Sequence, residues 1–125
     1  MKVLIDTNIW IDFVNGKDYS LSIQDMVSND LVLKHVWIEG ELRSGYIPNR
    51  LDFIETYSNL ETSKLINYEI LFVFIEKEKL FGKGLKLIDL GIYVSARMGG
   101  HLIWTHDKNL KKLCESKNIL YKETK

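Results

Sequence analysis

The hydrophobic positions of the chain fall into short runs of strand length, separated by longer segments with helical spacing. The runs are three or four residues long and are bounded by turn-forming residues, as buried strands are. Strands are predicted at residues 2–5, 31–33, 102–104 and 119–121. The first run is followed by Asp6-Thr7-Asn8 and the third by Thr105-His106-Asp107, and we expect both triplets to lead into helices.

Between these runs, hydrophobic residues recur every three or four positions, which is the spacing of a helix with one apolar face. In the segment from 66 to 79 this spacing places Ile70, Leu71, Phe74 and Ile75 together. Gly-containing breaks separate the segments. Helices are predicted at residues 9–14, 20–27, 36–43, 66–79, 87–98 and 109–116, with one more ahead of residue 66 in the region that begins at 49.

Alternating strands and helices predict an α/β fold in three layers, α/β/α, around a central parallel sheet of four to five strands. A chain of 125 residues suits one hydrophobic core, so we expect a single domain over residues 1–125. In such sheets ligands bind beyond the carboxyl ends of the strands, where the strand order reverses. Asp6 and Asp107 follow predicted strands and are expected at that edge.

The composition narrows the class of protein. Hydrophobic residues make up 46% of the chain and charged residues 27%, which is typical of a globular protein and excludes a fibrous or largely disordered one. No apolar run approaches the ~20 residues of a membrane span, and no secretory signal pattern is present. The single cysteine, Cys114, cannot form an internal disulfide. We therefore expect a cytoplasmic protein with no membrane partner.

Charge is balanced over the whole chain but not along it. The 17 Lys and Arg residues offset 17 Asp and Glu residues, which argues against a protein that grips nucleic acid by excess charge alone. The segment 107–125 is richer in lysine and is either a face that meets phosphates or a solvated helix surface. Lys83, Lys86 and Arg97 are further surface cations that could contact phosphates.

Four acidic residues, Asp6, Glu41, Asp89 and Asp107, are candidates for a metal site. Asp89 lies within an otherwise apolar helix, where an unpaired carboxylate is costly. Carboxylates drawn together repel one another, and a hard divalent cation such as Mg²⁺ neutralises them and takes their oxygens as ligands. Such a cation lowers the pKa of bound water and can direct that water at a phosphodiester.

Each of these acids also has a local explanation. Asp6 or Asn8 can cap the helix that begins near residue 9, and Asp107 can cap the helix at 109–116. Glu41 fits a solvated helix position. Asp89 fits the first turn of its helix, where the helix dipole favours an acid. Taken singly, none of the four identifies a site.

Taken together, the acids and their neighbours resemble the PIN-domain ribonucleases and, within them, the VapC toxins of toxin–antitoxin pairs. The likeness covers nearly the whole chain and is carried by Val3-Leu4-Ile5-Asp6-Thr7-Asn8, Glu41-Leu42-Arg43-Ser44-Gly45, Leu87-Ile88-Asp89-Leu90 with Ala96-Arg97, and Trp104-Thr105-His106-Asp107. The resemblance implies a PIN-like fold and a Mg²⁺- or Mn²⁺-dependent endoribonuclease, a hydrolase of RNA. Its implied catalytic residues are Asp6, Glu41, Asp89 and Asp107.

The resemblance also implies narrower roles and partners. Asp6 and Asp89 would be the direct metal ligands, with Asn8 and Thr105 orienting the carboxylates or water. The substrate would be RNA, with transfer RNA a common target of such toxins. A VapB-like antitoxin and a second copy of the chain in a homodimer are the implied protein partners. The apolar face from 66 to 75 offers a groove for the antitoxin, although core packing explains that face equally well.

Two other functions fit parts of the pattern. Asp6-Thr7-Asn8 after an apolar strand resembles the nucleophile loop of haloacid-dehalogenase-like phosphatases. In that family a general acid stands at the position of Asn8, and an amide cannot donate and reclaim a proton as a carboxyl group does. A degenerate PIN domain that only binds RNA or a protein is the non-enzymatic alternative, and the presence of all four acids argues against it.

Overall fold

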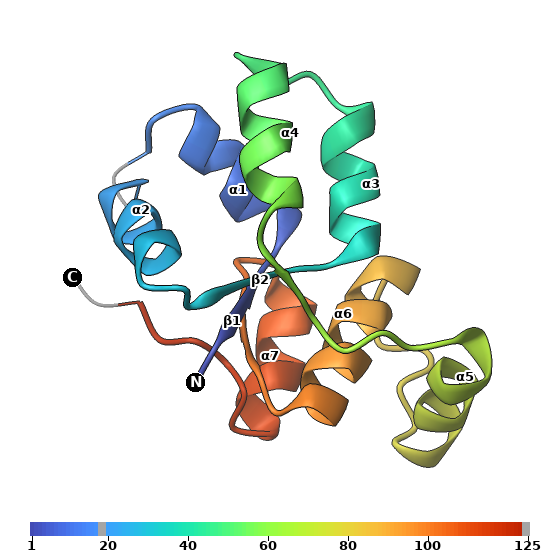
Figure 1. The fold of residues 1–125 in the computed structure, drawn as a ribbon. Helices are drawn as coiled ribbons and strands as arrows, with labels where there is room; N and C mark the ends of the chain where they lie inside the picture. The colour runs from blue at the N-terminus through green and yellow to red at the C-terminus, as the bar shows by residue number, and fades with distance from the viewer. Residues whose placement is uncertain (18–19, 124–125) are drawn as a thin grey trace.

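A computed structural model describes residues 1–17 and 20–123, and it shows a mixed α/β fold with a four-stranded parallel sheet (Figure 1). The predicted fold class is therefore confirmed. The elements, in chain order, are β1 (Val3–Ile5), α1 (Thr7–Val14), α2 (Ser20–Ser28), β2 (Val32–Lys34), α3 (Val36–Ser44), α4 (Arg50–Ser58), β3 (Glu61–Thr62), α5 (Tyr68–Lys77), α6 (Leu87–Gly99), β4 (Leu102–Trp104) and α7 (Lys108–Ser116).

Strand β1 lies inside the sheet, whose order is β3-β2-β1-β4. The chain crosses from β1 to β2 and then β3 in one direction, and returns so that β4 pairs with the other side of β1. The strand order therefore reverses between β1 and β4. Their carboxyl ends meet there, because Ile5 pairs with Trp104 and the Asp6 backbone N–H donates to the Trp104 carbonyl at 2.9 Å.

Helices cover both faces of the sheet. Helices α1 to α4 gather on one side of the strands and α5 to α7 on the other (Figure 1). This division follows from right-handed crossovers, because connections that run across the sheet in opposite directions lie on opposite faces. Within the described residues, no helix is both long and apolar enough to cross a membrane.

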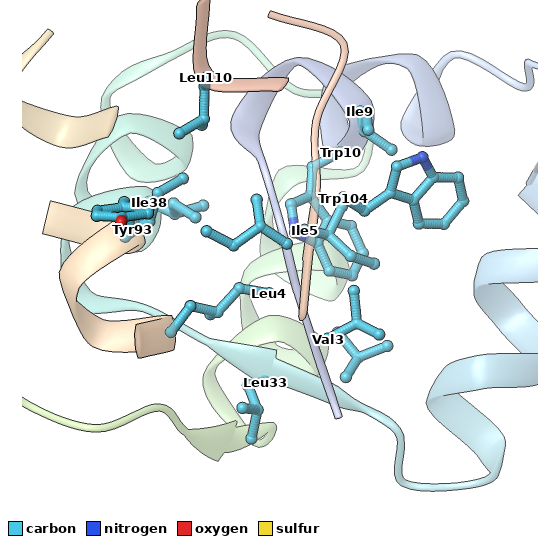
Figure 2. Close-up of a cluster of buried hydrophobic side chains, with 14 of the residues drawn as sticks. Val3, Leu4, Ile5, Ile9, Trp10, Leu33, Ile38, Tyr93, Trp104 and Leu110 are labelled. Carbon is cyan, nitrogen blue, oxygen red and sulfur yellow. The ribbon is translucent and has the colours of Figure 1, made fainter. Parts of the chain in front are cut away.

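The hydrophobic core is built around β1, whose three residues are at most 2% exposed. A strand covered on both faces reads as a continuous apolar run, which is why the sequence identified it. Figure 2 shows the β1 side chains in the middle of a buried cluster that includes Ile9 and Trp10 of α1, Ile38 of α3 and Tyr93 of α6. The strand that presents Asp6 is thus firmly held.

Three sequence expectations differ from the structure. Helix α1 begins at Thr7, two residues early, because Asp6 caps it. The expected strand at 119–121 is reduced to a single bridge between Leu120 and Ile103. Strand β3 was not expected, because its two residues are polar and exposed and carry no apolar signal.

The apolar face predicted on α5 is largely used for packing. Leu71 is fully buried, and Ile70, Phe74 and Ile75 pack against the core from partly buried positions. Core packing therefore accounts for the four residues that the sequence places on this face. The residues that α5 exposes are others, including Phe72 and Val73.

Candidate functional site

The end of β1 carries Asp6, which is only 6% exposed. Its Oδ1 accepts the Thr7 backbone N–H at 2.8 Å, which caps helix α1. Its Oδ2 accepts the hydroxyl of Thr105 at 2.7 Å. Asp6 is thus both a helix cap and a buried carboxylate at the carboxyl edge of the sheet. The two interpretations of this residue, as a cap and as an acid at that edge, are compatible.

The end of β4 carries Thr105 and Asp107. The Thr105 hydroxyl, while donating to Asp6, accepts the Asp107 backbone N–H at 3.0 Å. Asp107 in turn caps α7, because its Oδ2 accepts the Leu110 N–H at 2.9 Å. One buried hydroxyl therefore links the two acids, which is the orienting position expected of Thr105.

Asp89 approaches the same place from α6. It is 6% exposed, and its Oδ2 accepts the backbone N–H of Lys86 at 3.0 Å in the first turn of the helix. Within the described chain, no hydrogen bond reaches Oδ1 of Asp89 or Oδ1 of Asp107. Each of these carboxylates therefore keeps one oxygen available.

Glu41 is placed by a contact that the sequence did not reveal. The residue is exposed on α3, and its Oε1 accepts the Thr7 hydroxyl at 2.5 Å. Thr7 begins α1 directly after Asp6, so this bond ties the exposed glutamate to the buried acid's own turn. Thr7 is thus the residue of this turn that contacts one of the four acids, while Asn8 is exposed and makes no hydrogen bond to an acid of the described chain.

The electrostatics show that the four acids share one neighbourhood. Burial raises the pKa of the Asp6 carboxyl, and the negative charges of Asp107 and Glu41 raise it further, while hydrogen bonds from Thr105 and Thr7 lower it. Burial likewise raises the pKa of Asp89, with added repulsion from Asp107 and Asp6. The structure thus brings together acids from four separate segments of the chain.

Helices α3 and α6, which carry Glu41 and Asp89, are joined by a buried contact. His35 caps α3 by accepting the Trp37 backbone N–H on Nδ1 at 3.1 Å, which leaves Nε2 as the protonated nitrogen facing Ser95 Oγ at 3.0 Å. Burial lowers the pKa of His35 to about 4, so the ring is neutral. The Trp37 indole lies so close to α6 that a Cβ on Gly91 would come within 2.2 Å of it.

Three other residues that the sequence singled out are engaged within the fold. Arg97 forms an ion pair with Glu78 at 2.8 Å and is therefore engaged within the fold, which weighs against its suggested role as a free phosphate contact. His106, beside Asp107, is paired with Glu123. Buried Cys114 on α7 has its pKa raised to about 12 by burial, then by the charges of Asp6 and Asp89. Helix α7 therefore packs close to Asp6 and Asp89.

The donor chemistry of this neighbourhood suits a hard divalent cation. Carboxylate oxygens are the ligands that Mg²⁺ and Mn²⁺ prefer, and mutual repulsion that raises carboxyl pKa values is relieved by a positive charge. The acids are not drawn tightly together, however. Among the described residues, no three His, Cys, Asp or Glu side chains are grouped closely enough to share one metal ion.

Comparison with known proteins concerns the chain as a whole. No protein-family model matches the sequence. The chain is similar over nearly its whole length to ribonuclease VapC32 of Mycobacterium tuberculosis, with 27% identity over 122 residues that cover 97% of each chain, in both the CDC 1551 and the H37Rv strain.

Proposed function

We propose that this chain is a metal-dependent endoribonuclease of the PIN-domain, VapC type. The observation that carries the proposal is the pair of buried acids, Asp6 and Asp89, whose pKa values are raised by burial and by neighbouring acids at the carboxyl edge of a parallel sheet. Buried, mutually repelling carboxylates destabilise a fold, and groups with such perturbed pKa values cluster at functional sites. The likeness to a protein named ribonuclease VapC32 supports hydrolysis of RNA as the function of this site.

In this proposal Asp6 and Asp89 bind Mg²⁺ or Mn²⁺ directly. The bound cation would supply Lewis acidity and a water of lowered pKa for attack on a phosphodiester. Glu41 and Asp107 complete the set of catalytic acids around it. Thr105 holds the Asp6 carboxylate through its hydroxyl, and Thr7 holds Glu41 in the same way, so the two threonines fix the direction of the acids.

We extend the proposal to partners. As the toxin of a type II toxin–antitoxin pair, the chain would act in the cytoplasm on RNA and be held inactive by a VapB-like antitoxin, with a homodimer as its assembled form. The surface that suits an apolar antitoxin segment is a groove of about 460 Å³ between α1, α2 and α4, lined by Trp10, Phe13 and Phe53 among others. The Trp10 indole is part of this lining, and its buried Nε1 has no hydrogen-bond partner in the described chain.

The proposal is tested by incubating the purified chain with single-stranded and structured RNAs, with Mg²⁺, with Mn²⁺ and with EDTA. We expect internal cuts only in the presence of metal and none from Asp89→Asn. RNA that stays intact under every metal condition, although bound, would show a binding module instead. Metal-dependent turnover of a generic phosphomonoester, lost in Asp6→Asn, would favour a phosphatase.

A further inference from the structure

A cavity of about 370 Å³ lies between the loop that precedes α6 and the outer face of α7. It is lined by Lys83, Leu85, Asn109, Lys112, Leu113 and Ser116. The loop and the helix that form its two walls are each close in sequence to an acid of the candidate site. Leu85 is followed by Lys86, whose backbone N–H holds Asp89, and Asn109 lies two residues beyond Asp107. The cavity is therefore formed by the same segments of the chain that carry Asp89 and Asp107.

The two walls are fixed against each other by a close backbone approach. Gly84 adopts φ +71°, a conformation that favours glycine, and its carbonyl accepts the Asn109 side-chain N–H at 3.3 Å. A Cβ at position 84 would come within 2.6 Å of Asn109 Nδ2. The loop therefore sits directly on α7, and the cavity is shaped by the fold.

The chemistry of the lining suits one part of a nucleic acid strand. Lys83 and Lys112 are exposed and bring two ammonium groups, while no acid lines the cavity. Leu113 is 9% exposed and Leu85 is partly buried, so they provide an apolar surface below the lysines. By contrast, the cavity near Trp104 and Tyr121 is lined by two acids, Glu115 and Glu123, as well as two lysines, so its lining carries no excess of positive charge.

From these features we propose that the cavity holds the substrate strand beside the cut, with Lys83 and Lys112 binding a phosphate that flanks the scissile bond and Leu85 and Leu113 contacting its sugar or base. This inference rests on the proposed ribonuclease function. In this arrangement the acids would hold the cation at the phosphate that is cut, and the two lysines would hold the adjacent phosphate of the strand. It also explains how a chain with no net positive charge can bind RNA.

The test measures RNA binding without cleavage. A fluorescently labelled single-stranded RNA is titrated with Asp89→Asn protein over a series of salt concentrations. Adding Lys83→Gln and Lys112→Gln together is expected to weaken binding about 10-fold and to reduce the slope of log affinity against log salt by about 0.7, the contribution of one phosphate on a single strand. The matched control, Lys64→Gln with Lys77→Gln, removes the same charge outside the cavity and should leave the slope nearly unchanged.

A steric variant separates the cavity from general charge. Ser116→Trp fills the cavity without changing any charge and is expected to weaken RNA binding by a similar factor. Equal effects of the lysine pair and its control, or normal binding by Ser116→Trp, would overturn the inference. The failure of the proposed function is distinct, because wild-type protein with Mg²⁺ or Mn²⁺ would then leave the same RNA uncut.

Discussion

The four acids at the carboxyl edge form two contrasting pairs. Asp6 and Asp89 are each 6% exposed, and burial raises the pKa of both, whereas Glu41 is exposed and Asp107 is half-buried. For the exposed pair, water already solvates the charge, and a helix cap or a threonine contact explains the position. For the buried pair, ionisation at neutral pH works against folding. The buried pair, which lowers the stability of the fold when ionised, is therefore the stronger sign of a functional site.

The variant with the largest expected effect on the buried pair is Asp89→Asn. The amide keeps the size of the side chain and an oxygen for the Lys86 N–H, but removes the buried charge. Since a raised pKa means that ionisation destabilises the folded state, Tm should rise by about 4 °C, roughly the shift that 1 kcal/mol gives in a domain of this size. RNA cleavage should fall about 10³-fold. Both are measured on the same preparation.

The matched control is Asp52→Asn, an exposed acid in the first turn of α4. It should change the free energy of unfolding by less than about 0.5 kcal/mol and leave cleavage intact. An Asp89→Asn protein that is less stable than wild type and still cuts RNA would make Asp89 a structural cap and nothing more.

The pH dependence of stability sharpens the comparison. As pH falls, protonation of buried His35 lowers the free energy of unfolding, whereas protonation of the buried acids raises it. Its pKa is lowered to about 4 in the fold, so the unfolded chain binds the proton first as pH falls below 6.5. The stability that neutral His35 provides is therefore present above pH 6.5 and lost toward pH 4, by about 3 kcal/mol. Asp6 and Asp89 gain protons preferentially in the folded state and offset part of that loss.

Chemical denaturation between pH 7 and pH 4 separates these contributions. His35→Asn keeps an acceptor for the Trp37 N–H and should flatten the fall in unfolding free energy, while Asp89→Asn should steepen it. If the wild type and His35→Asn lose stability in parallel, the acid sensitivity has another source.

Much of this arrangement could be predicted from the sequence, for a physical reason. Strands β1 and β4 are buried on both faces, so they read as apolar runs, with Asp6 directly after β1 and Asp107 three residues after the end of β4. The apolar neighbours of Asp89 signalled its burial in the same way. Strand β3 left no such signal, because a two-residue polar edge strand is defined only by its pairing with β2.

Contacts between distant segments could not be read from the sequence. The Thr7 hydroxyl meets Glu41 from 34 positions away, and nothing local to either residue shows it. The sequence suggested Asn8 for a supporting role and not its neighbour Thr7, and successive residues on a helix point about 100° apart, so the two do not face the same way. His35 follows a strand just as Asp6 does, and that shared position was the one available sign of its role.

The link between the two pairs is the Thr105 hydroxyl, and Thr105→Val tests it. Thr105 is 2% exposed, so valine leaves Asp6 Oδ2 without its donor and the Asp107 N–H without its acceptor. We expect the free energy of unfolding to fall by about 2 kcal/mol and cleavage to fall about 10-fold. Thr105→Ser should restore both. Ser63→Ala is the contrasting variant, since the buried Ser63 hydroxyl has no partner in the described chain and its loss should be nearly neutral.

The smallest effect separates the two roles of Asp107. Asp107→Ala removes the acceptor for the Leu110 N–H and should lower the free energy of unfolding by about 1 kcal/mol, whereas Asp107→Asn keeps a capping oxygen and should leave Tm nearly unchanged. Cleavage then decides what the charge does. If Asp107 serves only as a cap, the asparagine variant cuts RNA as fast as wild type. If its free oxygen belongs to the catalytic set, activity falls in both variants while only the alanine variant loses stability.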